Sequence, residues 1–151
     1  MRKINRVVVS GIIVSKDNKI LLGKGQPGSV YKDCWLIPGG GVDEGETKIQ
    51  TLIREVKEEV NLDISNYHHE LVEDNATGES EKILKETGEH VLVHMQFFTY
   101  RIKVPKNANS IQIAAGDDLA ELTWAPIDNM ADYPLSPPSI NLFKKLGYLP
   151  V

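Results

Sequence analysis

Three glutamates, Glu55, Glu58 and Glu59, are the residues of this sequence whose type and spacing best suit shared chemistry. They lie in the segment from Thr47 to Val60, whose apolar residues repeat with the spacing of an amphipathic helix. At about 100° per residue, a helix places the carboxylates within roughly a 100° arc, away from the apolar stripe. Like charges at this spacing repel by about a few tenths of a kcal/mol per pair unless a cation lies among them. Oxygen ligands with no histidine or cysteine close by favour Mg²⁺.

An acidic helix face is, however, more often a solvated surface than a metal site. A glycine triplet, Gly39–Gly41, stands directly after the predicted short strand Trp35–Ile37 and shortly before the helix. Glycine has no side chain that would keep a ligand away from the backbone. We therefore expect the triplet to form a turn that brings the backbone close to a ligand.

Together, the residues from Gly40 to Leu62 resemble the signature of the Nudix hydrolases, G-x5-E-x7-R-E-U-x-E-E-x-G-U, in which U is aliphatic. The specified positions hold Gly40, Glu46, Arg54, Glu55, Val56, Glu58, Glu59, Asn61 and Leu62. The one departure is Asn61, which stands where the family has glycine. Asparagine adopts the left-handed conformation that ends such a helix most readily after glycine. We therefore expect a slightly less stable helix end and intact chemistry.

The resemblance implies roles for individual residues. Glu55, Glu58 and Glu59 would bind the metal ion, with the carbonyl of Gly39 completing the site. The ion would be Mg²⁺, for which Mn²⁺ can substitute. Within the catalytic motif, Arg54 would pair with Glu46 and hold the preceding loop against the helix.

The general base is less well defined, because the family takes it either from the helix glutamates or from a later loop. The later candidates here are Asp117, Asp118 and Glu121. We favour Glu121, which precedes Leu122 at the start of a predicted strand. An ordinary surface glutamate would give the same pattern.

Substrate contacts are expected from loops and strand faces around the metal. Lys24 and Arg101 are candidates for phosphate binding, Tyr31 for stacking on a base, and Gly40 for close approach of the substrate to the backbone. A solvated cation or a core aromatic residue is the more common explanation of each such side chain.

The function that the resemblance implies is attack of a metal-activated water on a phosphorus of a nucleoside diphosphate linked to another group. Nudix enzymes act on nucleoside triphosphates, nucleotide sugars, ADP-ribose, dinucleoside polyphosphates, coenzyme A and capped RNA. The short chain favours a (deoxy)nucleoside triphosphate, cut to monophosphate and pyrophosphate. ADP-ribose or a nucleotide sugar is the alternative substrate. A catalytically silent Nudix domain that binds nucleotides, and a protein whose acidic helix is coincidental, also stay open.

The remaining elements must position this helix. Residues 6–15 and 20–23 flank a polar turn and read as a hairpin, and residues 90–104 and 119–127 read as further strands. Ser136 opens a last helix that runs through Leu146 and is closed by Gly147. The polar stretch 73–89 is expected to be a long exposed loop or a distorted hairpin. This order favours an α/β fold, a Nudix-type α/β/α sandwich with a mixed sheet between helices.

Bulk composition bounds the class of protein. The 151 residues are the length of one domain, residues 1–151, with 41% hydrophobic and 25% charged residues. No segment resembles a membrane span or a signal peptide, and Cys34 is the only cysteine, so we expect a cytoplasmic protein. The net charge of −4 argues against binding of duplex nucleic acid, whereas a small nucleotide remains a fitting partner. A homodimer is an option that the resemblance leaves open.

Overall fold

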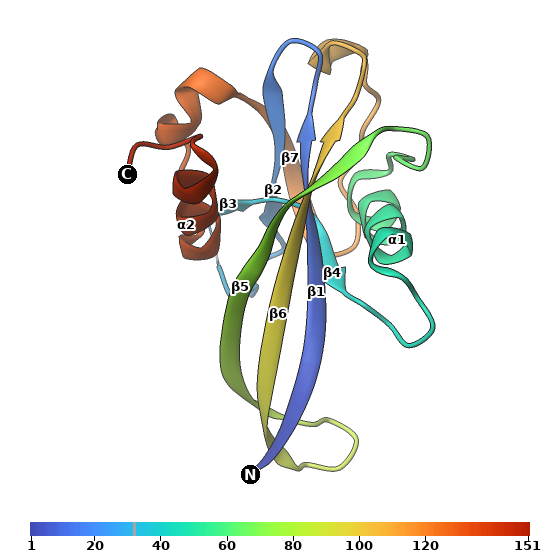
Figure 1. Ribbon diagram of the computed structural model, residues 1–151, viewed down its shortest axis with the longest axis vertical. Helices are drawn as coiled ribbons and strands as arrows, with labels where there is room; N and C mark the ends of the chain where they lie inside the picture. The colour runs from blue at the N-terminus through green and yellow to red at the C-terminus, as the bar shows by residue number, and fades with distance from the viewer. Residues whose placement is uncertain (32) are drawn as a thin grey trace.

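The computed structural model in Figure 1 describes residues 1–31 and 33–151. Its strands are β1 (Arg2–Val14), β2 (Lys19–Gly25), β3 (Trp35–Leu36), β4 (Gly39–Gly41), β5 (His69–Ile83), β6 (His90–Lys103) and β7 (Leu119–Pro126). Its helices are α1 (Lys48–Val60), α2 (Pro137–Leu146) and the short 3₁₀ helices η1 (Ala108–Ser110) and η2 (Ile127–Asp132). The predicted hairpin, the carboxylate helix and the closing helix are all present.

The strands form one mixed, seven-stranded sheet. β1 pairs in parallel with β6 along its whole length, and β5 adds to β6 in the antiparallel sense. On the other side, β2 pairs antiparallel with β7. Parallel and antiparallel pairs therefore coexist, as expected for a mixed sheet.

The sheet is split between its first two strands. β1 and β2 are paired at Val14 and Ile20, next to their connecting turn, and then β3 pairs with β2 while β4 pairs with β1. The glycine triplet is thus a strand hydrogen-bonded to β1, which corrects the prediction of a turn. Its close approach to its neighbours nevertheless follows from the missing side chains.

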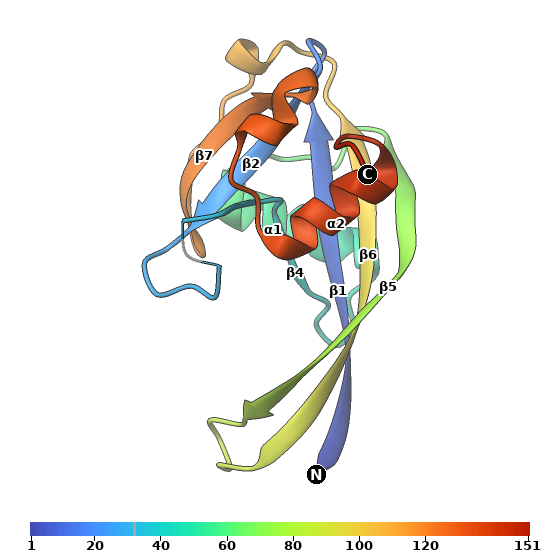
Figure 2. The same cartoon turned by 90° about the vertical axis from the view of Figure 1, so that its left-hand side faces the viewer.

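Helices cover both faces of the sheet, as Figures 1 and 2 show. On the α1 face, the helix residues Leu52 and Val56 pack with Val9, Ile13 and Leu21. On the α2 face, Phe143 packs with residues that alternate with those, such as Ile12, Ile20 and Leu22. Alternation of side chains along each strand feeds both layers, which confirms the α/β/α arrangement.

Both ends of α1 are set by local sequence. The hydroxyl of Thr47 accepts a hydrogen bond from the amide of Gln50, and the Gln50 side chain accepts one from the Thr47 amide. Such a reciprocal cap satisfies two amides that the helix leaves open. Asn61 ends the helix at φ 58° and ψ 36°, the left-handed conformation predicted for it.

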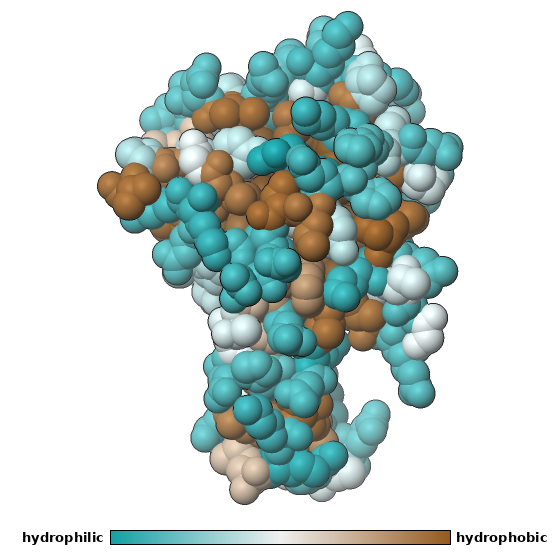
Figure 3. Space-filling model, viewed as in Figure 1, coloured by the Kyte–Doolittle hydropathy of each residue, from teal (hydrophilic) through white to brown (hydrophobic). Residues whose placement is uncertain are grey.

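The polar stretch after residue 73 forms the distorted hairpin, one of its two predicted alternatives, and not the loop. β5 continues to Ile83 and pairs with β6 as a hairpin, with irregularities between Leu71 and Glu73 and between Glu73 and Ala76. The distal parts of β1, β5 and β6 project beyond the helices as an arm (Figures 1 and 2). Figure 3 shows mostly hydrophilic residues on the visible side of this arm. Polar composition here therefore indicates solvent-exposed strand faces.

The closing helix α2 follows Ser136 and ends at Gly147, whose φ is 86°. Its residue Lys145 forms an ion pair of 2.8 Å with the buried carboxylate of Glu73, which anchors the helix to β5. Of the helices in the described ranges, none has the length and apolar character needed to cross a membrane.

Candidate active site

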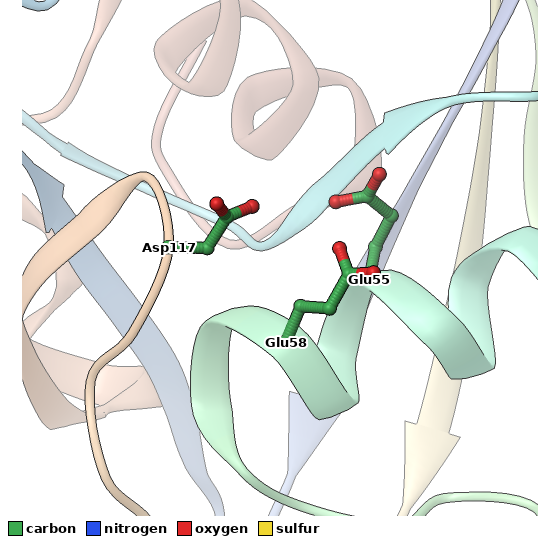
Figure 4. Close-up of side chains that lie close together, drawn as sticks. All are labelled: Glu55, Glu58 and Asp117. Carbon is green, nitrogen blue, oxygen red and sulfur yellow. The ribbon is translucent and has the colours of Figure 1, made fainter.

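Three carboxylates from two parts of the chain converge beside β4. Glu55 and Glu58 come from α1, and Asp117 comes from the turn before β7. One carboxylate oxygen from each of the three residues lies within 4.8 Å of the corresponding oxygens of the other two. Figure 4 shows the side chains directed toward a common space between helix and turn. The helix glutamates thus gain an acidic partner that is distant in sequence.

Glu59 lies beside this cluster in a different environment. It is 4% exposed, and its Oε1 accepts a hydrogen bond of 3.0 Å from the amide of Gly39. Because the amide and carbonyl of one strand residue point to the same side, the carbonyl of Gly39 also faces away from β1. The structure therefore brings Gly39 and Glu59 together, as the sequence pattern predicts, although Glu59 stands outside the three grouped carboxylates.

The bare backbone of β4 is required by its neighbours on both faces. A Cβ atom on Gly40 would overlap the carboxylate of Glu55, and one on Gly41 would overlap the guanidinium of Arg6. Successive strand residues point to opposite faces, so an acid and a base approach the same short strand from opposite sides. Glycine at position 40 lets Glu55 lie against the strand.

Burial and mutual repulsion raise the pKa values of two of these acids. Burial raises the pKa of Glu59 to about 8, with further contributions from the charges of Glu55, Asp118 and Asp117 and an opposing one from its hydrogen bond to Gly39. Burial also raises the pKa of Glu55, which Arg54 opposes and Glu58 reinforces. Arg54 therefore compensates the negative charge of these acids only in part.

Arg54 forms ion pairs with two of the helix glutamates and with the loop before α1. Its guanidinium pairs with Glu46 at 2.8 Å, with Glu55 at 3.1 Å and with Glu58 at 3.4 Å. The hydrogen bond from Arg54 holds the pKa of Glu46 down at about 2, and Thr51 and the amide of Asp43 add to this effect. The predicted pair of Arg54 and Glu46 is present, and it fixes the loop before α1 against the helix.

A hard divalent cation fits this set of groups. The cluster of Glu55, Glu58 and Asp117 offers oxygen atoms alone, which is the donor chemistry that such ions prefer. The raised pKa values of Glu55 and Glu59 show that added positive charge would be favourable at this place. The Gly39 carbonyl, on the same side as the Glu59 hydrogen bond, could complete the ligand set.

The structure does not bring Glu121 to the cluster. In the pairing of β2 with β7, Glu121 stands opposite Lys24, two positions along from Leu22, which belongs to the α2 face. Side chains two positions apart in a strand share a face, so Glu121 and Lys24 point away from α1. The preferred candidate for the general base is thus on the wrong side of the sheet, and Asp117 lies with the glutamates instead.

The predicted phosphate ligands Lys24 and Arg101 have other neighbours. The ammonium of Lys24 lies 4.7 Å from the ring centre of Trp35. Arg101 donates a 2.9 Å hydrogen bond to the hydroxyl of Tyr148 and pairs with Glu70 at 3.1 Å. Both cations are occupied within the α2 face.

Tyr31 does border the site. It lines a pocket of about 530 Å³ formed by residues 25–31 together with Leu36, Glu59, Asp118 and Leu119. The pocket places an aromatic residue, 39% exposed, within the same hollow as the buried glutamate. The prediction that Tyr31 stacks on a base remains compatible with this position.

Sequence reasoning missed two residues near the site. Gln26, in the pocket wall, donates hydrogen bonds to the turn that carries Asp117. Arg6, against Gly41, has no salt bridge within the described part of the chain, whereas Arg2, Arg54 and Arg101 each have at least one. No motif marks either residue, because each depends on contacts between segments far apart in sequence.

Comparison with known proteins gives a family match over most of the chain. The model of the NUDIX domain matches residues 4–146. A MutT structure from a study of Aliivibrio salmonicida and Vibrio cholerae superimposes with a TM-score of 0.67 at 18% identity, covering 94% of this chain and 96% of that one. The fold is therefore shared with MutT.

Curated relatives resemble the chain over different lengths. An ADP-ribose pyrophosphatase of Methanocaldococcus jannaschii is 50% identical over 56 residues, which are 37% of this chain and 32% of the relative. A CTP pyrophosphohydrolase of Escherichia coli is 25% identical over 144 residues, covering 91% of this chain and 89% of that protein. In the strongest local matches, the aligned part spans about a third of the relative's own length.

Proposed function

The chain belongs to the NUDIX domain family, and on that premise we propose that it is a Mg²⁺-dependent hydrolase of a pyrophosphate bond in a nucleotide. The substrate would be a nucleoside diphosphate linked to a further group, and a (deoxy)nucleoside triphosphate in the first place. The products would then be the nucleoside monophosphate and pyrophosphate.

The convergence of Glu55, Glu58 and Asp117 beside the glycine strand carries this proposal. A domain that merely retained the fold would have no need to direct three acids to one point, at a cost in repulsion. Glu59, buried next to the cluster and bonded to the Gly39 amide, adds a fourth acid whose pKa is raised to about 8. These features support a working catalytic site over a silent nucleotide-binding module.

The residues of the site would have different roles in this reaction. Glu55, Glu58 and Asp117 would hold the cation, and Arg54 keeps the two helix carboxylates in place through ion pairs. A bound Mg²⁺ would lower the pKa of a coordinated water and neutralise charge on the phosphate oxygens. Glu59 would act as the general base in its ionised form, a pKa near the working pH suits a group that takes up and releases a proton, and the Gly39 amide keeps its carboxylate oriented.

Arg6 supports an anionic substrate. Its guanidinium lies against Gly41, across β4 from Glu55, and lacks an acidic partner among the described residues. A chain of phosphates that passes the open edge of β4 would meet the cation held by the three carboxylates on one side and the guanidinium of Arg6 on the other. Arginine is well suited to bind phosphate oxygens in this way.

The favoured substrate class draws on a relative that aligns over 89% of its own length and whose name is CTP pyrophosphohydrolase. ADP-ribose is the second candidate, because the M. jannaschii ADP-ribose pyrophosphatase is 50% identical over the 56 residues that it shares with this chain. The pocket of about 530 Å³ beside Glu59 has room for either a base or a second sugar.

A substrate panel tests the proposal. The four dNTPs, CTP, ADP-ribose and two nucleotide sugars are incubated with the protein and Mg²⁺, and released pyrophosphate and monophosphate are measured. We expect release from at least one triphosphate, which a chelator abolishes and Glu58→Gln reduces strongly. Hydrolysis of ADP-ribose alone would replace the substrate class, and binding of nucleotides without any turnover would establish the silent module.

A further inference from the structure

Gln26 binds three successive carbonyl groups of the turn before β7. Its amide donates to the carbonyl of Asp118 at 3.0 Å, and its side-chain nitrogen donates to those of Asp117 at 3.4 Å and Leu119 at 3.3 Å. A single residue thus donates hydrogen bonds to the carbonyl groups of all three residues from 117 to 119. The contact joins segments 91 positions apart in the sequence.

The turn needs such support, because Asp117 has a φ of 51°. A side chain other than that of glycine is strained in this left-handed region, so the conformation persists only where surrounding contacts hold it. Gly116 supplies one anchor. Its amide donates to the carbonyl of Glu59 at 3.0 Å, and a Cβ atom there would lie 2.7 Å from the carbonyl oxygen of Glu58.

The turn is therefore clamped between α1 and Gln26, and Asp117 projects from it toward Glu55 and Glu58. Without the Gln26 side chain, the Gly116 anchor would remain, but the carbonyls of Asp117 and Leu119 would lose their partner. The direction of the Asp117 carboxylate would then be less restricted.

Gln26 also belongs to the wall of the pocket beside Glu59. Ser29, in the same wall, has a hydroxyl group that is buried and has no hydrogen-bond partner among the described residues. The amide of Ser29 donates to the carbonyl of Gln26 at 3.1 Å, so the pocket loop and Gln26 are tied together. A group entering the pocket would contact the same loop that holds the Asp117 turn.

We propose that Gln26 is a positioning residue, which fixes the Asp117 carboxylate for cation binding through its hydrogen bonds to the turn at residues 117–119. The inference rests on the proposed function insofar as Asp117 takes part in a cation site. It goes beyond it by linking the pocket wall to the strength of cation binding.

The test is a titration of the protein with Mn²⁺, followed by electron paramagnetic resonance. Gln26→Met removes the side-chain donors and keeps the length of the side chain. We expect the Kd for Mn²⁺ to rise about three- to tenfold, the range for the loss of ordinary hydrogen bonds. The matched control is Gln112→Met, since Gln112 is exposed and makes no side-chain hydrogen bond in the described part of the chain, and its Kd should not change.

A double-mutant cycle separates positioning from a general structural effect. If Gln26 acts through Asp117, then Gln26→Met should cause no further loss of Mn²⁺ affinity in an Asp117→Asn background. An equal loss in both backgrounds would overturn the proposal, as would an unchanged Kd in the single variant. Thermal unfolding of each variant checks that the fold persists.

The outcomes distinguish this inference from the proposed function. A wild-type protein that hydrolyses nucleotides while Gln26→Met binds Mn²⁺ normally contradicts the role of Gln26 alone. A wild-type protein that binds Mn²⁺ and shows the cycle, but cuts no nucleotide, contradicts the hydrolase alone. A wild-type protein that binds no Mn²⁺ contradicts both.

Discussion

Two regions supply the acids of the site, and they are held in different ways. Glu55, Glu58 and Glu59 stand on α1, a helix that begins and ends through contacts within its own segment. Asp117 stands on a short turn with a left-handed residue, supported by Gln26 from a distant part of the chain. Half of the site is therefore specified locally, and the other half exists only when the sheet has formed.

This difference indicates which substitutions remove a ligand from an intact site and which disturb the position of a ligand. Loss of a helix acid removes a ligand from a rigid frame. Loss of the turn acid, or of its support, removes a ligand whose position depends on tertiary contacts. Substitutions in the helix and in the turn separate these two cases.

The largest effect is expected from the helix half. Glu58→Gln should lower kcat/KM by about 10²- to 10³-fold, the range for removal of one group that stabilises charge at a reacting centre. The melting temperature should change little, because Glu58 is partly exposed and its ion pair with Arg54 is long at 3.4 Å. Steady-state kinetics and thermal unfolding measure both. An unchanged kcat/KM in this variant would remove Glu58 from the catalytic site.

A smaller effect is expected from the turn half. Asp117→Asn should lower kcat/KM by about ten- to a hundredfold, since an exposed ligand can be replaced by water. Glu121→Gln is the matched control, because Glu121 faces the α2 side, and we expect less than a twofold change. A larger loss in Glu121→Gln than in Asp117→Asn would contradict the assignment of Asp117, in place of Glu121, to the site.

Stability should depend on pH through Glu59. Its pKa is raised to about 8, above the ordinary value of 4.5, so the folded protein takes up a proton that the unfolded chain releases. This contribution is fully present below about pH 4.5 and is lost as the pH rises through 8. Glu46, with a pKa lowered to about 2, loses its contribution only in stronger acid and does not interfere.

In the absence of metal, the melting temperature should therefore fall by roughly 5–10 °C between about pH 5 and pH 8, which corresponds to a few kcal/mol. Glu59→Gln should flatten this dependence, and Mg²⁺ should offset the loss at the higher pH. Melting curves recorded with chelator and with Mg²⁺ check the prediction. Parallel slopes for the wild type and Glu59→Gln would show that another group is responsible.

The smallest effect concerns the end of the helix. Asn61→Gly places the family's residue at a φ of 58° and should stabilise the fold by about 0.5 kcal/mol, because glycine adopts this conformation without strain. Catalytic rates should remain unchanged. A destabilised variant in a denaturant titration would show that the Asn61 side chain has a role of its own.

The sequence predicted the elements whose pattern is local. The apolar repeat between Thr47 and Val60 predicted the helix α1, and Asn61 predicted its left-handed end; both are present, and the cap at Thr47 was found only in the structure. The hairpin of β1 and β2 and the closing helix α2 follow from β-branched runs and from the pair Ser136 and Gly147. In each case, the signal lies within the segment itself.

Features that depend on pairing between segments were predicted incompletely or not at all. Glycines 39–41 form a strand only because β1 is available to pair with them. The stretch after Glu73 is polar on both faces where the arm projects into solvent, so the sequence left a loop and a distorted hairpin open, and the structure shows the hairpin. Loop-like composition and an exposed hairpin cannot be told apart by polarity alone.

Glu121, which the sequence favoured as the general base, lies away from the acidic cluster for a specific reason. Its neighbours Leu122 and Trp124 pack on the α1 face, so alternation sends Glu121 to the opposite face. The apolar pattern of β7 contained this information, whereas the direction of Asp117 did not follow from any pattern. Contacts with distant segments hold this turn: Gln26 donates to its carbonyl groups, and Gly116 donates to the carbonyl of Glu59 on α1.

The central claim is that one divalent cation binds between the helix acids Glu55 and Glu58 and the turn acid Asp117. The most direct measurement is an anomalous difference map from a crystal soaked with Mn²⁺. The account predicts a peak within coordination distance of oxygens from all three carboxylates. A peak elsewhere, or a map without one beside these residues at saturating Mn²⁺, would contradict it.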